Sequence, residues 1–223
     1  MPQVTVVSPT YCEAKNLPLL FDRLKSALAD LDWELLVVDD DSPDGTAEIA
    51  RALAQSDYRL RVIQRLSRRG LSSAVVEGML ASSSPYLAVI DADLQHDETA
   101  LPAMLRMLRE SNDLQLVVGT RYVNGGTAQG LDSERLKMSR FATRLANLVS
   151  HTPVSDPMSG FFAVRRDAFM GVAHRLSDKG FKIMLDILAT AKPPLSVGEV
   201  AYQFRSREHG ESKLDSAVLW HYA

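Results

Sequence analysis

Two aspartates follow directly after an apolar run, and they are the side chains best suited to chemistry. The stretch Tyr-Leu-Ala-Val-Ile-Asp-Ala-Asp-Leu-Gln-His at residues 86–96 places Asp91, Asp93 and Gln95 just after a predicted buried strand. Two carboxylates at this spacing form a hard oxygen site that suits Mg²⁺ or Mn²⁺, ions that complete their shell with water and phosphate oxygens. A metal there indicates a phosphorylated substrate, whereas a solvated turn after the strand is the simpler alternative.

Two further polar clusters also follow or open predicted elements. Asp39, Asp40 and Asp41 end a second apolar run. One of these acids could cap the next helix, and another could accept hydrogen bonds from a base or a ribose. Arg69 and Gly70 form a basic turn whose N–H groups favour an anion, although such a turn is more often simply the start of a helix.

Positive charge is placed in the second half of the chain. The residues that carry it are Arg121, Arg135, Arg205, Arg207 and Lys213. These side chains form either a solvated face or a clamp that neutralises a pyrophosphate and a second phosphate. No Ser/His/Asp nucleophile arrangement and no Cys/His metal spacing accompanies them, and we expect Cys12 to be a packing residue.

Composition limits the classes of function. The chain has 223 residues, of which 46% are apolar, which is enough for one sizeable core. Its formal net charge of −3 argues against a nucleic-acid partner held by bulk charge. The single cysteine excludes an intramolecular disulfide and fits a reducing compartment.

Strands and helices are expected to alternate over about the first 120 residues. The predicted strands are Val4–Ser8, Trp33–Val38, Tyr58–Gln64, Tyr86–Ile90 and Leu114–Val118. The predicted helices are Lys15–Leu31, Asp44–Ala54, Gly70–Ser82 and Thr99–Glu110. This alternation predicts an α/β fold with a mainly parallel central sheet and helices on both faces. Ligands bind at the carboxyl ends of such strands, which is where residues 9–13, 39–44 and 91–95 would meet.

The pattern loosens after residue 118. We expect a loop at 119–130, then an amphipathic helix at Leu131–His151, then a strand, a helix and a strand at Phe161–Arg165, Gly180–Ala191 and Ser196–Phe204. The basic face of Leu131–Val149 either lies on anionic lipid or packs on the sheet. Residues 214–223 are expected to begin a helix that continues into a membrane region.

Several motifs occur in a fixed order along the chain. They are Pro-Thr-Tyr-Cys-Glu at 9–13, Val-Asp-Asp-Asp-Ser-Pro-Asp-Gly-Thr at 38–46, Gly-Leu-Ser-Ser-Ala at 70–74, Asp-Ala-Asp-Leu-Gln-His at 91–96, Gly-Thr-Arg-Tyr at 119–122, Asp-Pro-Met-Ser-Gly-Phe-Phe at 156–162, Gly-Phe-Lys at 180–182 and Gly-Glu-Ser-Lys at 210–213. Each is modestly specific, and the ordered set is highly specific. From residue 4 to residue 214 the chain resembles the family 2 inverting glycosyltransferases, in particular dolichyl-phosphate mannose synthases and their bacterial polyprenyl-phosphate relatives.

The resemblance implies a GT-A (Rossmann-like) fold, a nucleotide-sugar donor, a polyprenyl or dolichyl phosphate acceptor, and Mg²⁺ or Mn²⁺. It implies substrate-binding roles for Pro9, Tyr11, Glu13, Val38 and Asp40 at the nucleoside, for Arg69 and Arg207 at phosphates, and for Ser139 at the acceptor. Asp91, Asp93 and Gln95 would hold the metal. Arg121 and Arg135 would receive the acceptor phosphate, and Lys213 would close over the donor together with Arg207. Of these, Asp93, Arg121, Arg135 and Lys213 are the predicted catalytic residues.

The chain departs from the family pattern at three positions. Cys12 stands where Asn is usual, Arg69 stands near a usual Lys, and His209 stands where a second Arg is expected. Cysteine is the poorer hydrogen-bond partner, and arginine keeps the charge of lysine with a different geometry.

The sequence therefore predicts a catalytic domain at 1–213, working at the cytoplasmic face of a membrane. The expected reaction transfers a hexose to a lipid phosphate, with mannose from GDP-mannose ahead of glucose from UDP-glucose. A phosphate nucleophile is already ionised at neutral pH, so no side-chain general base is required. The alternatives are a non-catalytic nucleotide-sugar-binding module and a phosphohydrolase that uses Asp91 as its nucleophile.

Overall fold

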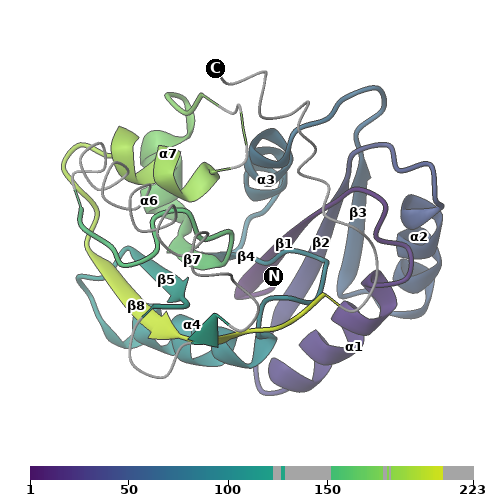
Figure 1. Cartoon of the computed structure of the whole chain (residues 1–223), viewed down its shortest axis with the longest axis horizontal. Coiled ribbons are helices and arrows are strands. Elements are labelled where there is room, and N and C mark those ends of the chain that lie inside the picture. The colour runs from purple at the N-terminus through teal and green to yellow at the C-terminus, as the bar shows by residue number, and fades with distance from the viewer. Residues whose placement is uncertain (123–126, 129–151, 178–179, 181, 208–223) are drawn as a thin grey trace.

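A computed structural model describes residues 1–122, 127–128, 152–177, 180 and 182–207. Its centre is a seven-stranded sheet in the order β3-β2-β1-β4-β7-β5-β8 (Figure 1). The strands of this sheet are β1 (Val4–Thr10), β2 (Trp33–Asp39), β3 (Leu60–Gln64), β4 (Tyr86–Val89), β5 (Leu116–Thr120), β7 (Phe162–Arg165) and β8 (Val197–Ala201). A second, two-stranded sheet pairs β6 (Thr127–Ala128) with β9 (Gln203–Phe204).

The sheet is mainly parallel, as the alternation of strands and helices predicts. Strands β3, β2, β1 and β4 pair in parallel, and so do β5 and β8. The exception is β7, which lies antiparallel between β4 and β5. Strand β2 is buried along its whole length, as expected for a strand covered on both faces.

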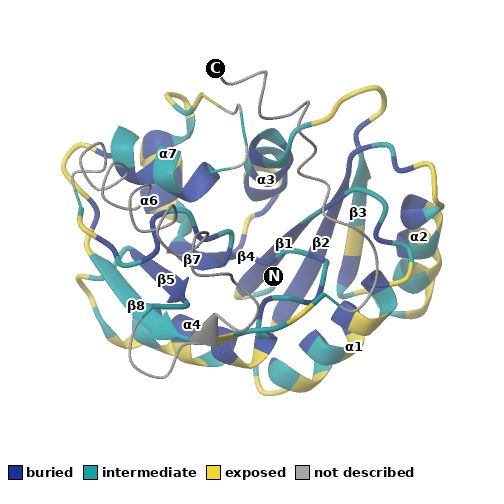
Figure 2. Cartoon of the chain, viewed as in Figure 1, coloured by how far each residue is buried: buried dark blue, intermediate teal, exposed yellow. Residues whose placement is uncertain are grey.

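Helices cover both faces of the sheet (Figure 1). They are α1 (Leu17–Ala27), α2 (Thr46–Ser56), α3 (Leu71–Leu80), α4 (Leu101–Glu110), α6 (Arg166–Ala173) and α7 (Ile183–Thr190), with a 3₁₀ turn at Glu98–Ala100. Apolar side chains of α1, α2 and α4 form one core with the sheet, and those of α3, α6 and α7 form a second core on its other face. Figure 2 shows the buried strands between these two layers of helices.

The structure corrects two predicted elements and adds one helix. Helix α1 is shorter than Lys15–Leu31, because it begins at Leu17 with a proline in its first turn and ends at Ala27. The added helix is α6, which was not predicted. The strand predicted at 196–204 is divided, because the chain leaves β8 after Ala201 and then pairs with β6.

The segment after residue 118 is only partly a loop. Strand β5 continues to Thr120, and Gly119 makes this possible because the Phe161 ring packs directly on it: a Cβ there would lie 2.4 Å from the ring.

The predicted helix at 131–151 and the predicted C-terminal helix at 214–223 lie outside the described residues. Among the helices that the structure describes, none is long and apolar enough to cross a bilayer.

Candidate active site

The carboxyl ends of β1, β2 and β4 bring three predicted clusters together. Strand β1 lies between β2 and β4, and the loop after it binds the loop after β2. The Cys12 amide donates to Ser42 Oγ at 2.9 Å, and the Glu13 amide donates to Thr46 Oγ1 at 2.9 Å. Residues distant in sequence thus form one polar edge, as predicted for a parallel sheet.

The three acids that end β2 have separate structural roles. Asp39 accepts hydrogen bonds from the Ser42 amide and hydroxyl at 2.9 and 2.6 Å, and it shapes the turn there. Asp41 accepts from Gln64 Nε2 at 3.0 Å. The N-cap residue of α2 is Gly45, and Asp44 just before it accepts from the Thr46 amide at 3.1 Å. The acid that reaches the first turn of the helix is therefore Asp44, not one of the three that end β2.

Asp40 forms a buried ion pair that sequence reasoning missed. Its Oδ1 accepts from Arg65 Nη1 at 2.7 Å, and its Oδ2 accepts from the Gly70 amide at 2.7 Å. Arg65 also donates to the Gly70 carbonyl and to Ser73 Oγ. Burial raises the pKa of Asp40 against the opposing effect of these partners. The pair fixes the turn that opens α3, and contact of Asp40 with a nucleoside stays a prediction.

Arg69 and Tyr11 join two predicted binding segments. The Arg69 guanidinium carbon lies 4.3 Å from the centroid of the Tyr11 ring, which is within cation–π distance. The stack places the basic turn before α3 against the loop after β1. Two residues predicted to bind substrate from separate motifs are therefore neighbours at the sheet edge.

The predicted metal ligands occupy one turn after β4. The backbone amide of Gln95 donates to Asp93 Oδ1 at 3.2 Å, which holds these two residues together. The Asp91 side chain is 32% exposed, yet desolvation by the surrounding protein, and then the negative charges of Asp93 and Glu13, raise the pKa of Asp91 to about 7. A cation at this turn would relieve that repulsion, and its ligands would all be oxygen atoms.

The predicted metal ligands from the protein are two carboxylates and one side-chain amide. In the described part of the chain, no group of three or more His, Cys, Asp or Glu side chains is arranged to hold a metal ion. The remaining ligands would come from water and substrate phosphate, which is the usual mode for Mg²⁺. Gly160 leaves room at the turn, because a Cβ there would lie 3.2 Å from Asp91 Oδ2.

Arg207 forms hydrogen bonds with two of the three predicted metal ligands. Its Nη2 donates to Asp93 Oδ2 at 2.8 Å and to Gln95 Oε1 at 3.3 Å. The segment is held there by backbone contacts, since the Arg205 amide donates to the Gln95 carbonyl at 2.9 Å. Arg205 itself binds Asp97 and Glu98 at 2.7 Å each. In this structure, the arginine that is predicted to close over the donor phosphates is therefore bound to two of the predicted metal ligands.

Arg121 is paired with an acid that the sequence did not single out as its partner. Its Nε and Nη2 donate to the two carboxylate oxygens of Asp156 at 2.8 and 3.1 Å, and Asp156 is 2% exposed. Burial opposes the charge of Arg121, yet the hydrogen bond and charge of Asp156 raise its pKa. A role for Arg121 at the acceptor phosphate stays a prediction. Arg135, Ser139 and Lys213 lie outside the described residues.

His96, for which the sequence suggests no role, is buried beside Asp91. Its Nδ1 accepts a hydrogen bond from the Asp91 amide at 3.2 Å. Burial lowers the pKa of His96 to about 4, so the ring is neutral at physiological pH. Phe161, Tyr202 and Phe204 surround it with ring centroids 5.1 to 6.1 Å away.

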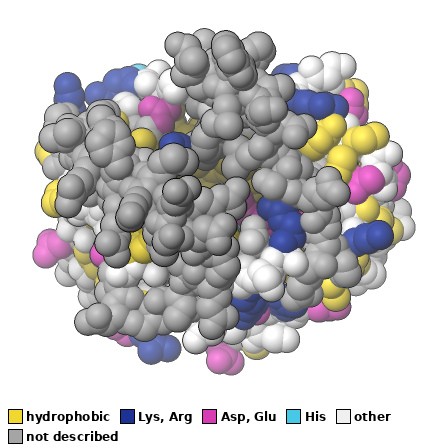
Figure 3. Space-filling view, viewed as in Figure 1, with side chains coloured by type: hydrophobic (Ala, Val, Ile, Leu, Met, Phe, Trp, Pro, Cys, Tyr) yellow, Lys and Arg dark blue, Asp and Glu magenta, His cyan; other side chains and the backbone are white. Residues whose placement is uncertain are grey.

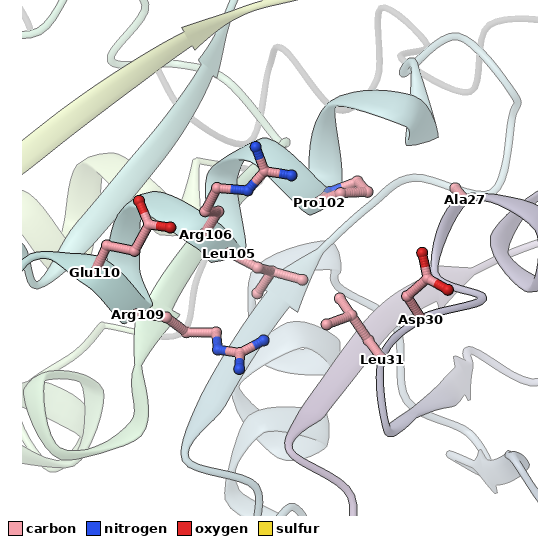
Figure 4. Close-up of a pocket in the computed structure, with 8 residues that line it drawn as sticks. All are labelled: Ala27, Asp30, Leu31, Pro102, Leu105, Arg106, Arg109 and Glu110. Atoms are coloured by element: carbon pink, nitrogen blue, oxygen red, sulfur yellow. The ribbon is translucent and has the colours of Figure 1, made fainter.

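A groove elsewhere on the molecule has none of the predicted site residues. It encloses about 440 Å³ between α1 and α4, and Figure 4 shows Arg106, Arg109 and Glu110 along one wall and Asp30 and Leu31 opposite. Its acids and arginines offset one another in charge. The surface in Figure 3 likewise mixes acidic and basic side chains where the described residues are visible.

Comparison with known proteins gives one matching family model, described as glycosyl transferase family 2, over residues 5–172. A dolichol-phosphate mannosyltransferase of Pyrococcus furiosus is 39% identical over 222 residues, which is 99% of this chain and 61% of that protein. Proteins of the same name from Mycosarcoma maydis and Saccharomyces cerevisiae are 37% and 36% identical, with 99% of this chain covering 76% and 84% of them. The chain therefore spans less than two thirds of the Pyrococcus protein.

Solved structures share the fold. Glucosyl-3-phosphoglycerate synthase from Mycobacterium tuberculosis, in complex with Mn²⁺, UDP-glucose and phosphoglyceric acid, superposes with a TM-score of 0.71 at 21% identity. The match covers 94% of this chain and 73% of that one. The same enzyme with UDP alone gives a TM-score of 0.65 at 20% identity, covering 97% and 75%. The mixed sheet with helices on both faces is thus the GT-A architecture.

Proposed function

The chain belongs to glycosyl transferase family 2, and we propose that it transfers a hexose from a nucleoside-diphosphate sugar to a dolichyl or other polyprenyl phosphate. GDP-mannose, which would supply mannose, is the favoured donor, and UDP-glucose, which would supply glucose, is the alternative. The observation that carries the proposal is the identity with dolichol-phosphate mannosyltransferases along nearly the whole chain. The reaction would take place at the cytoplasmic face of a membrane, where the lipid acceptor lies.

The geometry of the carboxyl edge supports a donor site for a nucleoside diphosphate. Tyr11, stacked on Arg69, and the loop after β2 lie on one side of it. Asp91 and Asp93 lie at the end of the neighbouring strand β4. A donor that spans this edge would place its nucleoside near Tyr11 and its diphosphate near the acids.

The chemistry requires little proton transfer from the protein. The acceptor phosphate oxygen is ionised at neutral pH and attacks the anomeric carbon, while the bond to the donor diphosphate breaks on the opposite side and the configuration inverts. Asp91, Asp93 and Gln95 would hold Mg²⁺ or Mn²⁺. When bound, the metal supplies positive charge that stabilises the leaving diphosphate.

The protein's own residues then have two tasks. Basic side chains orient the acceptor phosphate and offset its repulsion from the donor, which is the role proposed for Arg121 and Arg135. Arg207 and Lys213 add positive charge over the donor phosphates. Arg207 reaches them by leaving Asp93 and Gln95, the same residues that the metal would bind.

The test is a transfer assay with a panel of labelled sugar nucleotides, a short polyprenyl phosphate and Mn²⁺. We expect label from GDP-mannose in the lipid fraction. Asp93→Ala should lower that rate by about two to three orders of magnitude, because charge stabilisation by a metal amounts to several kcal/mol of barrier. Asp113→Ala, an exposed acid far from this turn in the loop after α4, is the matched control and should keep the rate.

One outcome would change the donor, and two would contradict the proposal. Label from UDP-glucose alone would replace mannose by glucose as the transferred hexose. Tight donor binding without any transfer would make it a binding module. Full activity of Asp93→Ala, or of the wild-type protein in excess chelator, would remove the metal from the mechanism.

A further inference from the structure

His96 is enclosed by aromatic rings that come from distant parts of the chain. It stacks on Phe161, with centroids 5.1 Å apart and planes 13° from parallel. The rings of Tyr202 and Phe204 meet it edge-on at 5.8 and 6.1 Å. Phe161 precedes β7, whereas the other two rings lie where β8 gives way to β9. With 5% of its surface exposed, the imidazole has little freedom to rotate.

His96 binds the backbone of Asp91 and lies close to its side chain. The Asp91 backbone amide donates to Nδ1 at 3.2 Å, so Nδ1 is unprotonated and the ring carries its proton on Nε2. Nε2 lies 3.8 Å from Asp91 Oδ2, which is too long for a hydrogen bond. His96 therefore holds the peptide of Asp91, and through it the starting point of the side chain.

Gly160 completes the enclosure from the other side. A Cβ at Gly160 would lie 3.2 Å from Asp91 Oδ2 and 3.5 Å from His96 Cε1. A side chain at position 160 would therefore press on the Asp91 carboxylate, whereas at His96 it would make an ordinary contact. The Asp91 side chain, which is 32% exposed, has the Gly160 backbone on one side and the His96 ring beside it.

We propose that His96 is a positioning residue that, by holding the Asp91 peptide, orients the Asp91 carboxylate toward a divalent cation. The proposal rests on the metal-binding role given to Asp91 in the proposed function. A metal ligand held in one orientation binds without losing rotamer freedom, and residues that orient ligands commonly contribute 10- to 100-fold in affinity. The aromatic rings also connect this ligand to the segment that carries Arg205 and Arg207.

Two substitutions separate the polar role of His96 from simple packing. His96→Asn keeps an acceptor near the position of Nδ1. His96→Leu fills space without an acceptor. Phe169→Leu is the matched control, since it truncates a fully buried ring of α6 in the opposite core.

The measurement is the Kd for Mn²⁺ alone, followed by the electron paramagnetic resonance signal of the free ion, together with the thermal midpoint of each variant. We expect His96→Leu to weaken Mn²⁺ binding about 10- to 100-fold, while His96→Asn stays within about threefold of wild type. Phe169→Leu should lower the thermal midpoint without changing the Kd. In a transfer assay, the His96→Leu defect should recover at saturating Mn²⁺.

The proposal is overturned if His96→Leu binds Mn²⁺ as wild type does, or if His96→Asn and His96→Leu lose affinity equally. It is also overturned if the wild-type protein does not bind Mn²⁺. Because Mn²⁺ binding needs neither sugar nor lipid, a protein that binds Mn²⁺ as described but transfers no hexose would contradict the proposed function while leaving the role of His96 intact.

Discussion

Asp91 and Asp40 are both acids at the carboxyl edge, the first partly exposed and the second buried, and their surroundings give them opposite roles. Asp40 has a buried cationic partner in Arg65, with an N–O distance of 2.7 Å. Asp91 has Asp93 and Glu13 as charged neighbours and feels Arg207 only as a smaller, opposing effect. The first arrangement is complete without a ligand. The second favours a cation, because burial and like charges both penalise the ionised carboxylate.

The raised pKa of Asp91 predicts how metal affinity depends on pH. A carboxyl whose pKa lies near 7 holds its proton below that pH, and the proton competes with the metal. We expect the affinity for Mn²⁺ to fall about tenfold per pH unit below 7 and to level off above it. An ordinary aspartate would keep its affinity down to about pH 4.

The check is a Mn²⁺ titration of the wild-type protein from pH 5.5 to pH 8.5. Asp91→Asn, which has no proton to lose, should bind weakly at every pH and show no such slope. A wild-type Kd that is constant across this range would contradict the account.

Helix α3 positions the basic turn at the carboxyl edge through very close packing on the sheet. Gly78 lies where a Cβ would come within 2.6 Å of Val7 Cγ1 and 2.9 Å of Val38 Cγ2. Both valines belong to strands whose ends carry the site, β1 and β2. The distance between α3 and these strands therefore fixes where Arg69 meets Tyr11.

A pair of glycine-to-alanine substitutions tests this packing. Gly78→Ala should lower the free energy of unfolding by about 1–3 kcal/mol, the usual cost of overpacking a well-packed core. Gly171→Ala in α6, where a new Cβ meets nothing within 4 Å, should raise it by about 0.5–1 kcal/mol through helix propensity. Denaturant unfolding of both variants decides the question, and equal effects at the two positions would contradict the packing argument.

Local patterns in the sequence predict the elements of the first half well, and long-range contacts explain what they miss. The apolar run before Asp91 and the glycine at the start of α3 are local signals, so β4 and α3 were located within two residues. The partners Arg65–Asp40 and Arg121–Asp156 are 25 and 35 residues apart, and nothing in the local sequence pairs them. The neutral state of His96 is likewise set by rings that only the fold brings together.

Over the whole molecule, the alternation of strands and helices predicts a mainly parallel sheet with helices on both faces, and the structure confirms it. The strand at 161–165 was predicted, but its antiparallel orientation as β7 was not. The pairing of β9 with β6 was not predicted either, because such pairings depend on neighbours distant in sequence. The catalytic domain at 1–213, its membrane surface and the helix at 214–223 stay predictions. So do the roles of Arg135, Ser139 and Lys213.

The most direct test of hexose transfer to a lipid phosphate is mass spectrometry of the acceptor. Dolichyl phosphate in detergent is incubated with the protein, GDP-mannose and Mn²⁺, in the presence or absence of a chelator. The lipid is then extracted and its mass is measured. We predict that the lipid gains the mass of one hexose, that the gain requires the metal, and that GDP is released in equal amount. Unmodified lipid alongside hydrolysed or intact GDP-mannose would contradict the account.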